Sequence, residues 1–359
     1  MEGELIHITH WLRPASWLYG VAVWLRNLLF DVGILKSEEF AIPTICVGNI
    51  TAGGTGKTPH TEYLLRLLLP RHSVAVVSRG YKRKSKGLVV ADAHTSMAEM
   101  GDEPWQMLHK YPEAQVVVDA DRRRALHYLQ DEAPQRPDVV LLDDAFQHRY
   151  VQASLNIVLT DYHRLVSDDC LLPAGRLREP LSALYRAQII VVTKCPRNLK
   201  PMDFRVLKKA LNLRPFQRIF YSTYRYGSIY RLFDSDSATQ ETSQSVLDAE
   251  THVLLLTGIA TPRQMMMDLA ATTRHITPLS FADHHDFSDT DVEDIESAFT
   301  ALQGNKRIVL TTEKDAARLR QVSHFSPILK RHLYVLPIEV EFLRDEGAAF
   351  DTLIGSSLI

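Results

Sequence analysis

Short apolar runs rich in β-branched residues recur along the chain and alternate with segments of helical periodicity. Before residue 200 these runs are TICVGN (44–49), SVAVVSR (73–79), QVVVDA (115–120), DVVLLDD (138–144), LNIVLTD (155–161) and QIIVVTK (188–194). They are apolar throughout instead of alternating, which is typical of strands buried on both faces of a parallel sheet. The segments between them, such as KTPHTEYLLRLLL, have the periodicity of crossover helices. The pattern predicts a doubly wound, mostly parallel α/β sheet with its ligand at the carboxyl ends of the strands.

A polar, acidic segment at 234–250 (DSDSATQETSQSVLDAE) interrupts this alternation and reads as a surface loop or domain joint. The alternation then resumes with HVLLLTGIATP, RIVLTTEKDAARLR and LYVLPIEVEF. We therefore expect an N-terminal segment at 1–35, a core at 36–224 and a smaller α/β domain at 225–359.

The N-terminal segment concentrates aromatic residues, because Trp11, Trp17 and Trp24 are three of the four tryptophans in the chain. From Trp17 onward, apolar residues follow at helical spacing to Leu35, with Arg26 and Asn27 as interruptions. No apolar run reaches the ~20 residues that span a bilayer, and neither a basic leader nor a small-residue cleavage site indicates a signal peptide. Two interpretations remain: a helix packed on the core, or a helix in the membrane interface with its tryptophans at headgroup depth.

The composition is ordinary for a globular protein, with 45% hydrophobic and 23% charged residues. A net charge of −2 gives no reason to expect nucleic acid as a partner. The cysteines Cys46, Cys170 and Cys195 are far apart and lack metal-binding spacing, which fits a reducing compartment.

The stretch VGNITAGGTGKTP at 47–59 carries the strongest chemical signal. It ends like the phosphate-binding pattern G-x-x-x-x-G-K-[ST], although Thr51 stands where the first glycine belongs. A strand, a glycine-rich loop and a helix N-terminus together form a phosphate cradle of the P-loop NTPase kind. The predicted nucleotide-binding residues are Thr51, Ala52, Gly53, Gly54, Thr55, Gly56, Lys57 and Thr58. Lys57 would reach the β- and γ-phosphates, and Thr58 would offer its hydroxyl to Mg²⁺.

A magnesium site needs a further acidic partner, and Asp143 and Asp144 follow a buried strand. Either could bind the ion, and an acidic pair here could also cap the next helix. The stretch Thr193-Lys194-Cys195-Pro196 lacks the aspartate of the guanine-reading N-K-x-D motif, which favours ATP over GTP.

The order of motifs resembles the tetraacyldisaccharide 4′-kinases (lipid A 4′-kinases). The matching stretches are VGNITAGGTGKTP, SRGYKRKSKG, GDEP, DADRR, LLDDAFQHR, LLPAGRLREP, ADHH and TTEKDA, over about residues 43–315. The family's loop resembles T-x-G-G-[TS]-G-K-[TS], so Thr51 matches it. The resemblance implies ATP- and Mg²⁺-dependent phosphorylation of the 4′-hydroxyl of a tetraacyldisaccharide 1-phosphate, which gives lipid IV-A. It also implies a peripheral enzyme at the cytoplasmic face of the bacterial inner membrane, attached through its N-terminal helix, and no obligate protein partner.

The resemblance assigns Asp102 of GDEP as the base for the 4′-hydroxyl, assisted by His284. Without it, Asp102 reads as a helix cap and Glu103 as a first-turn acid. The doubled histidine leaves His285 as an alternative partner, and a metal site is the competing interpretation of the pair.

Further residues match the family's phosphate or substrate contacts, or follow the acidic pair toward the site. They are Arg79, Tyr81, Glu103, Arg122, Gln147, His148 and Arg178, with Glu179 as a supporting member of the magnesium shell. By itself the basic run that begins at Arg79 reads as a solvated loop, and the resemblance favours its contact with the lipid's 1-phosphate or acidic headgroups.

Two other classes fit the loop alone. A membrane-associated switch ATPase would hydrolyse ATP without phosphorylating a lipid. A GTPase metallochaperone would bind an ion at the histidine pair, but the absent N-K-x-D and the lack of paired cysteines count against it.

Overall fold

The computed structural model describes residues 8–233, 246–258, 263–282, 285–322 and 324–358. The chain divides into two compact units. The first contains the residues up to Tyr224 and again those from Val340 onward, and the second is Arg225–Glu339.

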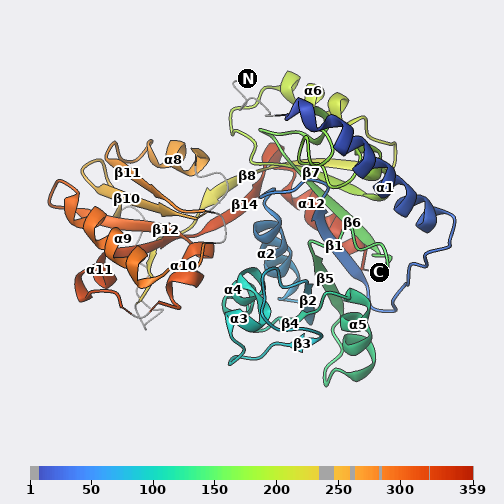
Figure 1. Ribbon diagram of the computed structural model, residues 1–359, viewed down its shortest axis with the longest axis horizontal. Helices are drawn as coiled ribbons and strands as arrows, with labels where there is room; N and C mark the ends of the chain where they lie inside the picture. The colour runs from blue at the N-terminus through green and yellow to red at the C-terminus, as the bar shows by residue number, and fades with distance from the viewer. Residues whose placement is uncertain (1–7, 234–245, 259–262, 283–284, 323, 359) are drawn as a thin grey trace. The chain divides into compact units, whose positions relative to one another are not determined.

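A nine-stranded sheet forms the centre of the first unit (Figure 1). Its order is β14-β8-β7-β6-β1-β5-β2-β4-β3, and the pairings from β8 to β4 are parallel. The strands are β1 (Thr44–Asn49), β2 (Val74–Ser78), β3 (Val89–Val90), β4 (Gln115–Val118), β5 (Val139–Asp143), β6 (Leu155–Asp161), β7 (Ile189–Thr193), β8 (Arg218–Tyr226) and β14 (Ile338–Phe342). The predicted fold class, a P-loop-like doubly wound sheet, is confirmed.

Strand β1 lies between β5 and β6, so the strand order reverses there. In the parallel register Val47 pairs with Asp143. The loop after β1 and the acidic pair after β5 therefore leave the sheet at the same edge, where ligands of such sheets bind.

Helices cover both faces of this sheet because its strand residues alternate between two cores. One core joins Cys46 and Leu142 to α5 and α6, and the other joins Ile45 and Leu141 to α2, α4 and α12. The helices of the first unit are α1 (Arg13–Asp31), α2 (Lys57–Leu68), α3 (Met97–Met100), α4 (Asp102–Lys110), α5 (Arg122–His127), α6 (Pro201–Leu211) and α12 (Gly347–Ser356). Short 3-10 or π turns are His10–Leu12, Tyr128–Glu132, Val166–Asp168, Leu181–Arg186 and Leu343–Asp345.

The second unit has a five-stranded sheet of order β11-β10-β12-β13-β9, in which β9 pairs antiparallel and the others parallel. Its strands are β9 (Tyr230–Arg231), β10 (His252–Thr257), β11 (Ile276–Ser280), β12 (Arg307–Thr312) and β13 (Leu333–Leu336). Its helices are α8 (Arg263–Leu269), α9 (Asp289–Ala301), α10 (Glu313–Leu319) and α11 (Pro327–His332).

The end of the chain differs from the expected division, which placed all of 225–359 in the second domain. Val340 onward belongs to the first unit. There Phe342, Phe350 and Ile354 are buried in the core that also holds α2.

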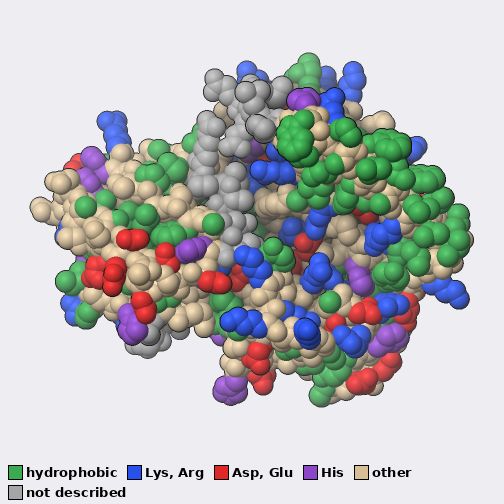
Figure 2. All heavy atoms as spheres, viewed as in Figure 1, with side chains coloured by type: hydrophobic (Ala, Val, Ile, Leu, Met, Phe, Trp, Pro, Cys, Tyr) green, Lys and Arg blue, Asp and Glu red, His purple; other side chains and the backbone are tan. Residues whose placement is uncertain are grey.

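Helix α1 has two faces of different character. Its apolar face is exposed, with Trp17 at 69% and Trp24 at 59% exposure, and Figure 2 shows hydrophobic side chains gathered along this helix. Its other face is docked by polar contacts: the Ser16 hydroxyl donates to the Leu171 carbonyl at 2.9 Å. Among the described residues, no helix combines the length and apolarity that crossing a membrane requires.

Candidate active site

The loop at 51–58 joins β1 to α2 in the conformation of a phosphate cradle. Gly53 and Gly56 have φ angles of 118° and 88°, in the left-handed region that glycine tolerates best. Gly56 is also the N-cap of α2, so the loop leads directly into a helix N-terminus. Backbone N–H groups at such a terminus have no intrahelical partner, and they favour an anion.

Two side chains at the end of β7 donate hydrogen bonds to carbonyl groups of this loop: Thr193, the last residue of the strand, and Lys194, which follows it. The Thr193 hydroxyl donates to the Thr55 carbonyl at 2.9 Å. The Lys194 ammonium donates to the Gly54 carbonyl at 2.6 Å and pairs with Asp161 at the same distance. The segment that lacks the guanine-reading aspartate therefore supports the loop directly.

Asp143, the last residue of β5, is buried and accepts hydrogen bonds from the Thr61 and Ser78 hydroxyls, each at 3.3 Å. Burial raises the pKa of Asp143 to about 7, and the carboxylates of Glu103 and Asp144 add to the rise. This carboxyl group therefore holds a proton readily until a cation is near.

Asp144 has the opposite electrostatic surroundings. Its carboxylate lies 3.7 Å from the Lys57 ammonium and 2.8 Å from the Arg178 guanidinium. Burial alone would raise the pKa of Asp144, but Lys57 and Arg178 outweigh it and lower the pKa overall. The two adjacent acids thus differ in charge state near neutral pH.

Arg122, at the start of α5, places a buried guanidinium beside the acidic pair. It donates to the carbonyls of Ala120 at 3.0 Å and Asp144 at 3.3 Å, and its Nε has no hydrogen-bond partner. Burial lowers the pKa of Arg122, as does the neighbouring charge of Arg79. A buried cation with an unused donor is suited to an anionic ligand.

The loop after β2 packs against the N-terminus of α4. A Cβ on Gly101 would lie 3.0 Å from the Tyr81 carbonyl, so the two backbones are in direct contact. Asp102 and Glu103 form the first turn of α4, and the Asp102 carboxylate accepts from the Glu103 N–H at 3.0 Å. Strand β2 pairs in parallel with β5, so the contact with the loop after β2 brings the first turn of α4 to the sheet edge where Asp143 lies.

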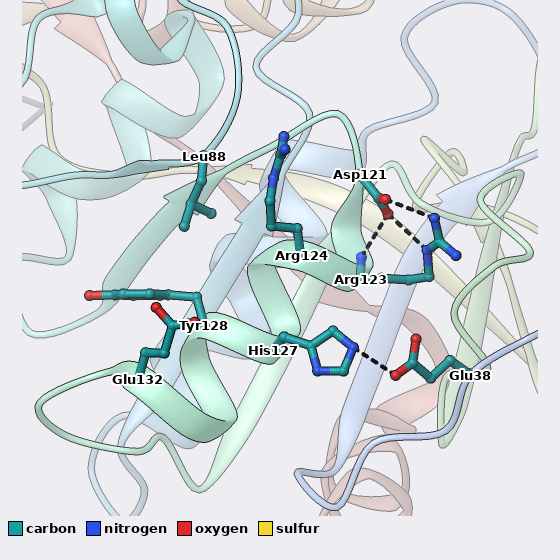
Figure 3. A pocket seen from close by; sticks show the side chains of 8 residues that line it. All are labelled: Glu38, Leu88, Asp121, Arg123, Arg124, His127, Tyr128 and Glu132. Carbon is teal, nitrogen blue, oxygen red and sulfur yellow. Dashed lines mark hydrogen bonds and ion pairs between the residues drawn. The ribbon is translucent and has the colours of Figure 1, made fainter.

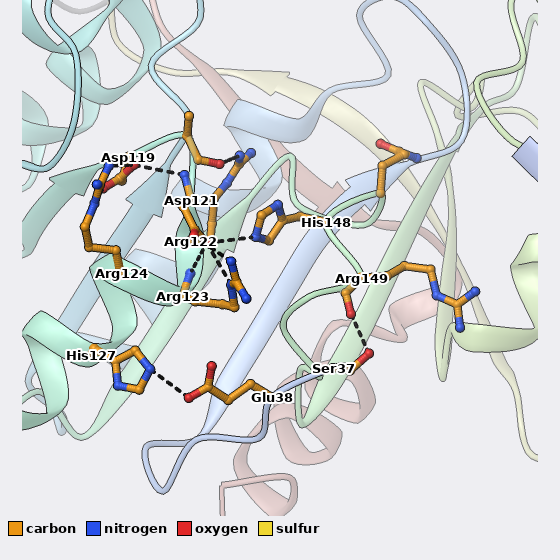
Figure 4. Close-up of polar contacts among 12 residues, drawn as sticks. Ser37, Glu38, Asp119, Asp121, Arg122, Arg123, Arg124, His127, His148 and Arg149 are labelled. Carbon is orange, nitrogen blue, oxygen red and sulfur yellow. Dashed lines mark hydrogen bonds and ion pairs between the residues drawn. The ribbon is translucent and has the colours of Figure 1, made fainter. Parts of the chain in front are cut away.

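The segment after the acidic pair also faces the loop. The Gln147 amide donates to the Asn49 carbonyl at 2.6 Å, while its own Oε1 is buried without a partner. Burial lowers the pKa of His148 to about 4, and repulsion from Arg122 contributes. His148 is therefore neutral near pH 7, with Nε2 at 3.6 Å from the Asp121 carboxylate (Figure 4).

Comparison with known proteins assigns nearly the whole chain to one kinase family. The family model for LpxK, tetraacyldisaccharide-1-P 4′-kinase, matches residues 8–358. The tetraacyldisaccharide 4′-kinase of Phocaeicola vulgatus is 51% identical to this chain, over 99% of this chain and 96% of its own length. That of Bacteroides fragilis is 49% identical, over 98% of this chain and 93% of its own length. The chain belongs to the tetraacyldisaccharide-1-P 4′-kinase family. Its activity is thus ATP-dependent phosphorylation of the 4′-hydroxyl in lipid A biosynthesis.

A crystal structure of the Aquifex aeolicus member of this kinase family, in complex with ATP, is similar in fold. Its TM-score is 0.73 at 28% identity, over 98% of this chain and 99% of that one. ATP is the phosphoryl donor of the family reaction.

Among the described residues, the structure brings most of the predicted site residues to one edge of the sheet. Asp283 and His284 lie outside the described residues. The neighbouring His285 bonds to Asp291 at 3.1 Å and lies against Phe281, which gives it a local structural partner.

Glu179, predicted as a supporting magnesium ligand, is buried in an ion pair with Arg186, and Arg26 of α1 lies 3.8 Å away. This placement gives the carboxylate two cationic partners. It lends no support to a magnesium role.

His60 supports the phosphate loop although it belongs to no motif that the sequence analysis identified. His60 of α2 bonds to the Gly56 carbonyl at 2.7 Å and to the Ser222 hydroxyl of β8 at 2.9 Å. Burial lowers the pKa of His60 to about 4, so it stays neutral and ties the loop to β8. An apolar helix face with one histidine gives no signal for such a contact.

An open pocket of about 420 Å³ lies beside α5 (Figure 3). Its lining residues are Glu38, Leu88, Asp121, Arg123, Arg124, His127, Tyr128 and Glu132. The charges within it pair locally, as Asp121 does with Arg123 at 2.8 Å and Glu38 with His127 at 2.7 Å. We assign it no part in the reaction.

Proposed function

We propose that the kinase reaction takes place where the phosphate loop, the acidic pair and the first turn of α4 meet. Asp102 accepts the proton of the 4′-hydroxyl. The hydroxyl oxygen bonds to the γ-phosphorus of ATP, and the bond between that phosphorus and the ADP oxygen breaks. Lys57 stabilises the phosphate charge, and His284 shares the proton with Asp102. The observation that carries the proposal is that Lys57 pairs with Asp144 at the sheet edge to which the loop after β2 brings the first turn of α4.

The donor set at this edge fits Mg²⁺. The hydroxyl of Thr58 and the carboxylates of Asp143 and Asp144 are the hard oxygen ligands that this ion prefers. When bound, Mg²⁺ would neutralise charge on the β- and γ-phosphates. Because Asp144 already pairs with Lys57 and Arg178, we favour Asp143 as the carboxylate that gains most from the cation.

For the lipid, we assign the sugar and phosphate contacts to residues around Arg122. The unused Nε of Arg122 and the unpartnered Oε1 of Gln147 are buried groups whose hydrogen bonds a polar ligand would complete. Arg79, Tyr81 and His148 would supply further contacts on the same side.

We also propose that the exposed face of α1 lies in the interface of the inner membrane, on its cytoplasmic side. The supporting observation is the row of exposed tryptophans and leucines on a helix whose other face is docked. Indole rings favour the headgroup region, and the apolar face would meet the acyl chains.

The test is label transfer from γ-labelled ATP, with Mg²⁺, to a tetraacyldisaccharide 1-phosphate in detergent micelles. Lys57→Ala should reduce transfer by at least ~100-fold, because it removes charge stabilisation in the transition state. Lys208→Ala, which changes an exposed lysine on α6, is the matched control and should transfer at the wild-type rate. ATP hydrolysis without labelled lipid would instead support a switch ATPase.

A further inference from the structure

The docked face of α1 makes two kinds of contact with the first unit. Toward its end, Asp31 accepts from Arg149 at 2.6 Å and from the Tyr185 hydroxyl at 2.9 Å. Figure 4 shows Arg149 also bound through its carbonyl to Ser37, in the segment that follows the helix. These contacts hold the helix in place but do not reach the phosphate loop.

Arg26, in the middle of the helix, makes a different contact. Its guanidinium donates to the Gln147 carbonyl at 2.7 Å and lies 3.8 Å from the Glu179 carboxylate. Glu179 is buried, and its Oε1 has no hydrogen-bond partner. Arg26 of α1 thus binds the segment that directly follows the acidic pair.

From Gln147 a continuous series of hydrogen bonds leads to the phosphate loop. The Gln147 amide donates to the Asn49 carbonyl at 2.6 Å, and the Asn49 amide donates to the Thr55 hydroxyl at 2.8 Å. Asn49 also accepts from Arg178, which in turn pairs with Asp144. Each member of the series is thus hydrogen-bonded to its neighbour.

We propose that Arg26 is a positioning residue for the nucleotide site. It fixes the Gln147 backbone, and through Gln147 and Asn49 it fixes Thr55 in the loop. The inference rests on the proposed binding of ATP at 51–58. Its consequence is that the helix with the exposed apolar face is linked mechanically to the site of phosphoryl transfer.

The chemistry of arginine suits this position. Its planar group presents several donors at fixed angles, so it can serve the Gln147 carbonyl and the Glu179 carboxylate together. Without it, Glu179 loses one of its cationic neighbours in a buried site, and the Gln147 carbonyl loses its side-chain donor. Lysine has one compact ammonium group, so it would replace only the contact with the Gln147 carbonyl or the contact with the Glu179 carboxylate.

The first test compares Arg26→Ala with Asp31→Ala in the full-length enzyme, by steady-state kinetics in micelles. We expect Arg26→Ala to lower kcat/KM for ATP by about tenfold, since small displacements of catalytic groups are costly. Arg26→Lys should recover part of the loss. Asp31→Ala removes an exposed anchor of the same helix and should stay within about twofold.

Equal kinetics for the Arg26→Ala and Asp31→Ala variants would overturn the proposal, as would a change confined to KM for the lipid. If Arg26→Ala fails to fold, kcat/KM for ATP of Arg26→Lys is compared with that of Asp31→Ala instead. A Lys57→Ala variant that still phosphorylates lipid would remove the proposed function itself. Loss of transfer in Lys57→Ala with wild-type ATP kinetics in Arg26→Ala would overturn this inference alone.

A double-mutant cycle tests the series of bonds. Thr55→Val removes the hydroxyl that accepts from Asn49. If Arg26 acts through this bond, the double variant should lose less ATP affinity than the two single losses predict. Additive losses would show that Arg26 acts elsewhere and would overturn the proposal.

Discussion

At the scale of single residues, the adjacent carboxyl groups of Asp143 and Asp144 have pKa values shifted in opposite directions. Asp144 faces Lys57 and Arg178, while Asp143 is buried with two hydroxyl groups as its donors. One acid is held ionised, and the other is poised to exchange a proton for a cation.

This difference predicts a pH-dependent affinity for Mg·ATP. Below the raised pKa of Asp143, about 7, cation binding must displace a proton, so affinity should fall by up to about tenfold per pH unit. Above about pH 8 the affinity should be flat. Isothermal titration calorimetry in buffers of different ionisation enthalpy would count the released proton.

Asp143→Asn is the control for that experiment, because an amide cannot titrate. Its affinity for Mg·ATP should be weaker and without slope between pH 6 and 8. A wild-type profile that is flat over this interval would contradict the assignment of the slope to Asp143.

Residues that a motif places in order along the chain could be predicted from the sequence. Lys57 and Thr58 follow a glycine loop, and Asp143 and Asp144 follow a buried strand, so parallel strands bring them together. Asn49 and Lys194 could not be predicted. Their contacts with the loop depend on which strands lie side by side and on backbone carbonyls, which have no sequence signature.

At the scale of elements, the structure of α1 bears on the two interpretations that its periodicity left open. The helix is docked, and its apolar face is nevertheless exposed. Arg26 interrupts the apolar pattern in the sequence, and in the structure it is one of the docking contacts. The pattern therefore identified the apolar face, but it could not show that this face is exposed or what the polar interruption binds.

The exposed face predicts membrane binding. Replacing Trp17 and Trp24 with serine should reduce co-sedimentation with phosphatidylethanolamine–phosphatidylglycerol vesicles by at least about tenfold, since each indole contributes to partitioning. The affinity for ATP should be unchanged.

Phe216→Ser, at another exposed aromatic position of the first unit, is the matched control. Unchanged sedimentation of the tryptophan double variant would mean that α1 does not bind the bilayer through this face.

At the scale of the whole molecule, the first unit is discontinuous in sequence. The apolar run LYVLPIEVEF reads as one strand, yet Pro337 separates β13 of the second unit's sheet from β14 of the nine-stranded sheet. A hydrophobic pattern shows that both segments are buried, but not in which core. The expected second domain, 225–359, therefore wrongly included the residues from Val340 onward, which belong to the first unit.

This return predicts that the C-terminal residues stabilise the ATP-binding unit. Phe350 packs against Phe342 at 4.3 Å and Phe220 at 5.2 Å between ring centroids, and Phe350→Ala should cost about 3–5 kcal/mol. In thermal unfolding, the transition that ATP shifts upward should move to lower temperature.

The matched control is Phe216→Ala, which removes an exposed ring of the same unit and should leave the midpoint in place. A loss confined to a transition that ATP does not shift would place α12 outside the ATP-binding unit.

The discontinuity also bears on the order in which the protein is made. Domains fold as units during synthesis, but the last three residues of β14 and the whole of α12 are translated after Arg225–Glu339. The unit encoded in the middle is thus complete before the unit encoded first. A ribosome that stops between residues 58 and 340 releases a chain with every residue of the phosphate loop and an unfinished core beneath it.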